Sequence, residues 1–240
     1  MLRGRDRQRV AVDALLGRAR AGRGGALVVC GEPGSGRTAL LDHARRSYDA
    51  VLCVDDVREL TDDLRRLASD VTDTSAALLL ATEGETFGLP AVVLDPLDRA
   101  ESLLVLHDLL PGLPAALAVD LADLACGNPL ALVELAGSLT SDQLGGIAPP
   151  PDGLPLASSL RGRLLARFAG LPERARRVVA LAAVDEELTA DVLARLTGDV
   201  DAVTEAGALL DPRRWCGRRW RGLSPACGSG RTRSWPGCCR

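Results

Sequence analysis

The segment Gly31–Thr38 has the residue types and spacing of a loop that binds an anion. It reads GEPGSGRT, which fits the pattern G-x-x-x-x-G-K followed by Ser or Thr, except that an arginine replaces the lysine. Glycines let the backbone turn tightly, so that consecutive N–H groups point at an anion, and the helix expected next adds its positive end. The alternative is a turn that binds nothing. The residues expected to hold phosphate oxygens are Gly31, Glu32, Pro33, Gly34, Ser35, Gly36, Arg37 and Thr38, with the Thr38 hydroxyl on Mg²⁺.

Arg37 changes the chemistry expected of this loop. A lysine ammonium is a compact point charge, whereas a guanidinium is a broad planar fork that needs more room. Arg37 can neutralise phosphate charge through two parallel hydrogen bonds, but it does not fit between the β- and γ-phosphates as a lysine does. The sequence therefore predicts retained or weakened nucleotide binding and strongly impaired hydrolysis, as in a degenerate ATPase.

A pair of carboxylates follows the apolar run at residues 51–54. In P-loop proteins such a strand places one aspartate near Mg²⁺ beside the phosphates. We assign Asp55 to the metal, through water, and Asp56 to the catalytic role of orienting the attacking water. The alternative is a strand that runs into a turn whose aspartates cap the next helix.

The elements that must position these residues alternate between strands and helices. Short apolar runs predict four strands buried on both faces, at residues 26–30, 51–54, 76–81 and 91–94. Apolar residues at helical spacing predict helices at about 6–21, 38–47 and 58–69. The fold class expected is therefore α/β, a P-loop NTPase parallel sheet of about four strands flanked by helices and followed by a small all-helical block.

After Asp95 the strand pattern stops and helices are expected at about 98–110, 114–126 and 128–139. The run of three prolines that begins at Pro149 predicts a linker. The predicted organisation is a nucleotide-binding core (1–95), a helical lid region (96–146), a linker (147–156), a helical block (157–210) and a basic tail (211–240).

Composition separates the tail from the rest of the chain. From Pro212 to Arg240 there are eight arginines and no acidic residue, although the whole chain carries a net charge of −3. All three tryptophans and four of the seven cysteines also lie there. We expect a disordered tail read out of frame from a GC-rich gene. The alternatives are an arm that contacts nucleic acid through arginine and tryptophan, and a zinc site, which lacks the usual ligand spacing.

The chain shows no sign of a membrane or of secretion. No apolar run approaches the ~18–20 residues that span a bilayer, and the segment that starts at Met1 lacks the apolar core of a signal peptide. We expect a cytoplasmic protein without a membrane partner.

The segments described above resemble the large ATP-binding LuxR-family transcriptional regulators, which belong to the STAND class of AAA-related ATPases. The likeness covers about residues 2–210. It rests on four segments: Leu2–Arg5, the glycine-rich loop with the next three residues (31–41), Val-Asp-Asp at 54–56 and GNPLALVEL at 127–135. It implies that Arg5 lies on the base side of the nucleotide, that Pro129 packs near the adenine and that Thr82 senses the γ-phosphate. It also implies ADP or ATP with Mg²⁺ as the cofactors, and a winged-helix-like domain over 157–208.

Three features depart from that family. Only about 17 residues separate Arg37 from Asp55, so an outer strand is missing and the aspartate strand is expected to become an exposed edge. Glu83 stands where the family carries an arginine after the sensor strand. The resemblance ends at about Leu210, before the wing and the DNA-binding module, so DNA binding is not expected of this chain.

These patterns predict an ATP- or ADP-binding regulatory switch module of a LuxR-type transcriptional regulator, with weak or no ATP hydrolysis. Its expected partners are the nucleotide and either regulatory proteins or a second copy of the chain. The alternative is a nucleotide-inactive, truncated regulator that acts only as a protein-interaction fragment.

Overall fold

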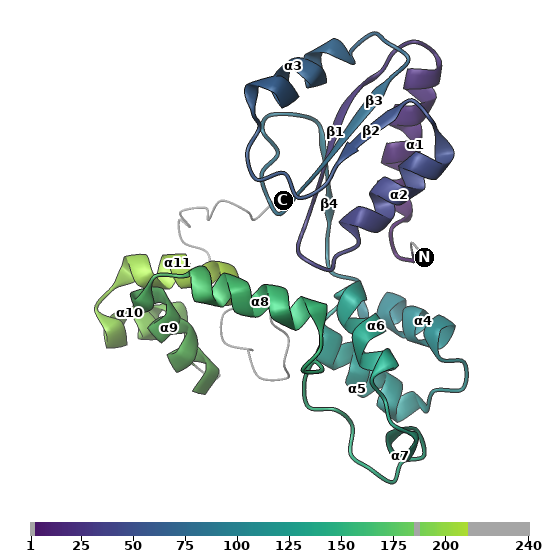
Figure 1. The fold of residues 1–240 in the computed structure, drawn as a ribbon. Helices are drawn as coiled ribbons and strands as arrows, with labels where there is room; N and C mark the ends of the chain where they lie inside the picture. Colours follow the sequence, from purple (N-terminus) through teal and green to yellow (C-terminus); the bar gives the residue numbers. More distant parts are fainter. Residues whose placement is uncertain (1–2, 185–187, 211–240) are drawn as a thin grey trace, which may run out of the picture. The chain divides into compact units, whose positions relative to one another are not determined.

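The computed structural model describes residues 3–184 and 188–210, which form two compact units (Figure 1). The first unit ends at Gly170 and the second begins at Leu171. The predicted tail at 211–240 lies outside the described residues. Within the described ranges, no helix is both long and apolar enough to cross a membrane.

The first unit is built on a parallel sheet with the strand order β2-β3-β1-β4. The strands are β1 (Gly25–Gly31), β2 (Val51–Val54), β3 (Ala77–Thr82) and β4 (Ala91–Leu94). Because all four run in one direction, their carboxyl ends meet at the same edge of the sheet, where ligands of such folds bind. The predicted α/β sheet of four strands is confirmed.

Helices cover both faces of this sheet (Figure 1). Alternate residues of the central strands point to opposite faces. Leu79 of β3 packs in the cluster formed with α1 (Asp6–Arg20) and α2 (Arg37–Ser47), whereas Leu78 and Leu80 pack with residues of α3 (Asp62–Asp70) and the segment after it. This two-sided burial explains why the central strands read as continuous apolar runs rather than as alternating ones.

Strand β2 forms one edge of the sheet, as the short spacing between the loop and the aspartates predicts. It pairs with β3 alone, and the Leu52 side chain is 46% exposed. The guanidinium of Arg45 donates a hydrogen bond to the carbonyl of Cys53 at 3.2 Å. A charge at an edge strand hinders pairing with another chain, and Arg45 of α2 brings a positive charge to this edge.

The rest of the first unit is helical. It contains α4 (Arg99–Leu109), α5 (Ala115–Ala125), α6 (Pro129–Gly137), α7 (Ser141–Leu144) and α8 (Ser159–Gly170). Fully buried leucines at 106, 121, 132 and 135 form its core, and Leu160 of α8 joins them. Helix α8 therefore belongs to the first unit, so the block predicted over 157–210 spans parts of both units.

The second unit holds three helices within 171–184 and 188–210. They are α9 (Glu173–Val184), α10 (Ala190–Thr197) and α11 (Val200–Leu210). Val178, Leu193 and Val203 pack together in its core. The helical character agrees with the prediction, while the winged-helix domain implied by the resemblance stays a prediction.

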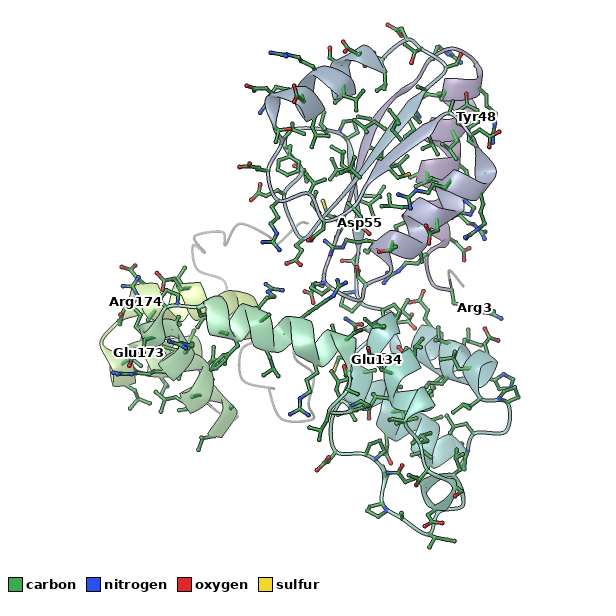
Figure 2. The ribbon with its side chains drawn as sticks, viewed as in Figure 1. Arg3, Tyr48, Asp55, Glu134, Glu173 and Arg174 are labelled. Carbon is green, nitrogen blue, oxygen red and sulfur yellow. The ribbon has the colours of Figure 1, made fainter. Side chains whose placement is uncertain are left out.

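Helix α8 is fixed to the helical core by Glu134 of α6, whose carboxylate lies at the start of α8 (Figure 2). It accepts hydrogen bonds from the Ser159 backbone N–H at 2.8 Å, from the Ser159 hydroxyl at 2.6 Å and from the Ser158 hydroxyl. Burial acts to raise the pKa of Glu134, but these bonds and that of the Leu160 backbone outweigh it and hold the pKa below its ordinary value. The ionised carboxylate thus holds the first turn of α8.

Replacing Glu134 by Gln is expected to lower the free energy of unfolding at pH 7 by about 1–2 kcal/mol, because charge-assisted hydrogen bonds become neutral ones. Since the pKa of Glu134 is lower in the folded chain, its contribution is complete above the ordinary glutamate value of about 4.3 and is lost as the pH falls through the folded value. Urea unfolding followed by circular dichroism, with Glu59→Gln as the control at an exposed position, measures both effects. A wild-type advantage that persists unchanged at pH 3 would contradict this role.

Candidate functional site

The loop between β1 and α2 lies at the carboxyl end of the sheet. Gly34 has φ +82° and Gly36 φ +102°, conformations that strain any residue with a side chain. A Cβ added at Gly31 would stand 2.4 Å from the Ser35 hydroxyl oxygen. Gly36 precedes α2 and makes no side-chain cap, so the first N–H groups of the helix are left to bind an external acceptor. This is the backbone geometry of an anion cradle.

Arg37 is the first residue of α2 and places a buried cation at this cradle. Its side chain is only 5% exposed. The Nη1 atom is buried and has no hydrogen-bond partner among the described residues. The Nη2 atom lies 3.9 Å from the Glu83 carboxylate and 4.0 Å from the Asp56 carboxylate. An unpaired buried donor is costly, so Nη1 is a donor for which the described residues supply no acceptor.

Arg5 supports the loop from the other end of the chain. Its buried guanidinium donates a hydrogen bond to the Ser35 carbonyl at 3.0 Å and another to the Asp95 carbonyl, just beyond β4. Burial lowers the pKa of Arg5, and the nearby Glu101 and Asp95 carboxylates oppose that effect. The Ser35 hydroxyl, also buried, has no partner within the described ranges, and its N–H bonds the Glu32 carbonyl. These contacts assign Arg5 to loop support, and the contact with a base stays a prediction.

Thr38 and Asp55, the two residues assigned to magnesium, lie in direct contact, and their role in holding the ion stays a prediction. The Thr38 hydroxyl donates to Asp55 Oδ2 at 2.7 Å, and Asp55 Oδ1 accepts the Asp56 N–H at 2.9 Å. Figure 2 shows Asp55 directly after β2. The described residues hold no group of three or more His, Cys, Asp or Glu side chains that could bind a metal by themselves. Hydroxyl and carboxylate oxygens fit Mg²⁺, which commonly takes one or two protein ligands and completes its shell with phosphate and water.

Asp56 has a left-handed backbone with φ 56°. Its carboxylate lies 3.7 Å from Arg58 and 4.0 Å from Arg37. The side chain is mostly exposed, so water can reach it. The role of orienting an attacking water stays a prediction, and the structure adds that this carboxylate also faces two arginines.

Residues at the end of β3 contact two other elements of the first unit, α2 and α8. Thr82 is fully buried, and its hydroxyl donates to the Glu85 carbonyl at 2.8 Å. The γ-phosphate contact assigned to Thr82 stays a prediction. Glu83, 44% exposed, lies 3.9 Å from Arg37 and also 3.7 Å from Arg167 on α8. Sequence reasoning missed Arg167, because nothing in its spacing on α8 indicates a contact with a strand end.

Asn128 joins the helical region to the loop. Its side-chain amide donates to the Pro33 carbonyl at 2.9 Å, while its oxygen caps α6 by accepting the N–H groups of Leu130 and Ala131. The Leu130 N–H also bonds the Gly34 carbonyl at 3.2 Å. Pro129 occupies the first turn of α6 beside these contacts and is half-buried. Its packing near an adenine stays a prediction, whereas the loop contact of Asn128 is new.

Comparisons with known proteins establish the fold of the chain. No family model matches it, and no curated protein sequence matches it. A variant of RuvB from Thermotoga maritima aligns with a TM-score of 0.50 and 16% identity, over 85% of each chain. A STAND protein with a tetratricopeptide repeat sensor from Pyrococcus horikoshii aligns with a TM-score of 0.38 and 12% identity, over 81% of this chain and 38% of that one. The likeness to RuvB, an AAA+ P-loop ATPase, shows that this chain has the P-loop ATPase fold.

Two substitutions at Asn128 separate its contacts. Asn128→Ala removes both the helix cap and the bond to Pro33, and we expect the free energy of unfolding to fall by about 1–2 kcal/mol. Asn128→Asp loses the bond to Pro33 and places a carboxylate at that carbonyl, but it keeps the oxygen that caps α6. We therefore expect a smaller loss of stability than for Asn128→Ala. Urea unfolding at pH 7 measures both. An Asp variant as stable as the wild type would show that the bond to Pro33 contributes nothing.

Proposed function

We propose that this chain is a regulatory module that binds ADP or ATP with Mg²⁺ and hydrolyses ATP weakly or not at all. The observation that carries the proposal is the buried Arg37 guanidinium, whose Nη1 has no partner among the described residues and which stands at the glycine-rich loop and the start of α2. A buried cation with an unused donor beside free backbone N–H groups suits a phosphate better than any neutral ligand.

The oxygen pair of Thr38 and Asp55 supports the magnesium part of the proposal. The hydroxyl and the carboxylate bond each other at 2.7 Å; Thr38 would hold the ion directly and Asp55 through water. Bound Mg²⁺ would neutralise charge on the phosphate oxygens. The loop N–H groups and Arg37 would orient the phosphates. Arg5 would hold the loop conformation through its hydrogen bond to the Ser35 carbonyl.

Three observations favour weak hydrolysis. An arginine occupies the lysine position at the cradle, and its Nη2 already faces Asp56 and Glu83. The Thr82 hydroxyl is engaged with the Glu85 carbonyl. The Asp56 carboxylate faces two arginines, Arg58 at 3.7 Å and Arg37 at 4.0 Å, and these cations compete with an attacking water for it. Catalysis of phosphoryl transfer depends on accurate positioning of such groups, so these departures affect turnover more than binding.

The regulatory role rests on the LuxR-type resemblance and on the way in which the helical region contacts the loop. Asn128 and Leu130 bond two carbonyls of the loop, so a change of loop conformation on nucleotide binding would reach α6 directly. A module of this kind would report the bound nucleotide to protein partners or to a second copy of the chain.

Thermal unfolding with nucleotide tests the binding proposal. Mg-ADP or Mg-ATP at about a hundred times its dissociation constant is expected to raise the midpoint by about 5–10 °C, because a ligand that binds only the folded state stabilises it. Asp55→Asn should remove the part of the shift that depends on Mg²⁺, whereas Asp63→Asn, an equal charge change on an exposed residue of α3, should leave it intact. No shift at millimolar nucleotide would favour the alternative of a nucleotide-inactive interaction fragment.

ATP turnover tests the weak-hydrolysis proposal. The wild-type chain should release phosphate no faster than Asp55→Asn does. Arg37→Lys restores the compact charge that the pattern normally carries and is expected to raise the turnover number by about tenfold or more. Phosphate release under saturating Mg-ATP measures it. Equal turnover in the Lys and Arg forms would show that this position does not limit hydrolysis.

A further inference from the structure

Glu83 connects three elements at the phosphate end of the candidate site. Its carboxylate follows β3 and lies 3.9 Å from Arg37 at the start of α2 and 3.7 Å from Arg167 on α8. All three residues belong to the first compact unit. The Glu83 carboxylate thus forms ion pairs with two arginines of the same unit.

The two ends of the Arg37 guanidinium are in different states. Nη1 is buried and has no partner in the part of the chain that the structure describes, whereas Nη2 faces the carboxylates of Glu83 and Asp56. A phosphate bound to Nη1 would engage the end of the guanidinium for which no carboxylate contact is found among the described residues. A further phosphate that approaches Nη2 meets two negative charges already there.

The surrounding charges leave little room for another anion. Asp55 lies beside Thr38, Asp56 faces Arg58 and Arg37, and Glu83 faces Arg37 and Arg167. Like charges a few ångströms apart repel, and the repulsion is stronger at a partly buried position than in water. The arginines near Nη2 are therefore already matched by carboxylates.

We propose that Glu83 sets the phosphate-chain length that the site accepts, so that the site takes a nucleoside diphosphate in preference to the triphosphate. The inference rests on the proposed nucleotide binding and adds the specificity-determining residue. A triphosphate must either displace Glu83 from Arg37 or leave its third phosphate beside that carboxylate without a cation of its own, and a diphosphate avoids both.

Arg167 gives the proposal a second, opposite consequence. Its charge offsets that of Glu83, so removing it leaves the carboxylate more negative toward an incoming phosphate. Loss of Glu83 charge should weaken the preference for diphosphate, and loss of Arg167 charge should strengthen it. A purely structural role of the pair would change both variants in the same direction.

Isothermal titration with Mg-ADP and Mg-ATP provides the test. The wild-type chain is expected to bind ADP about tenfold more tightly than ATP. Glu83→Gln should reduce that ratio about fivefold, mainly by tightening ATP binding, and Arg167→Gln should raise it about twofold, since partly exposed ion pairs contribute modestly. Glu85→Gln, an equal charge change two residues away on an exposed side chain, is the matched control and should keep the wild-type ratio.

Each outcome decides a separate point. Equal affinities of the wild type for ADP and ATP, or a ratio unchanged by Glu83→Gln, would overturn the specificity role while leaving nucleotide binding in place. A Glu85→Gln ratio that falls as far as that of Glu83→Gln would also overturn it, as would shifts of the same sign in the Glu83 and Arg167 variants. Failure of the folded wild type, checked by circular dichroism, to bind either nucleotide would refute the proposed function and this inference with it.

Discussion

The buried guanidinium of Arg37 is the constraint on which the site depends. A charged group that is 5% exposed must find counter-charges, and here Nη2 faces two carboxylates while Nη1 has no partner among the described residues. The glycine-rich loop, the start of α2 and the ends of β2 and β3 are arranged around this cation. Each proposal above concerns which anions it takes: Glu83, Asp56 or a phosphate.

A second buried arginine, Arg5, stabilises the loop by donating hydrogen bonds to backbone carbonyls, whereas Arg37 faces carboxylates. Its hydrogen bonds tie the Ser35 carbonyl to the carbonyl of Asp95 after β4, and Asn128 ties the Pro33 carbonyl to α6. Backbone carbonyls of the loop are thus bonded from two directions, while the Ser35 N–H bonds the Glu32 carbonyl within the loop itself. A loop held by its carbonyls, with the uncapped start of α2 beside it, is shaped for an anion before any ligand arrives.

The sequence predicted the sheet well because its signals are local. Continuous apolar runs bounded by glycine or aspartate indicate buried parallel strands, and the order of motifs placed Thr38 and Asp55 at one edge, where they are 2.7 Å apart. The sequence did not predict the contacts that side chains of helices far along the chain make with the loop and the strand ends. The sequence around Asn128 predicts a helix cap but not the hydrogen bond that its side chain donates to the Pro33 carbonyl. No pattern around Arg167 predicts its ion pair with Glu83. Those contacts depend on how the helical region packs, which short-range periodicity does not encode.

The position of β2 at the edge of the sheet is compatible with an intact site for a topological reason. The groups of the cradle come from the carboxyl ends of β1, β2 and β3, which remain neighbours in the order β2-β3-β1. A strand beyond β2 would add packing to Leu52 and Cys53 but would contribute no backbone to the loop. The edge position of β2 therefore leaves the geometry of Thr38, Asp55 and Arg37 to be set by β1, β2 and β3, and Arg45 contacts that edge through the Cys53 carbonyl.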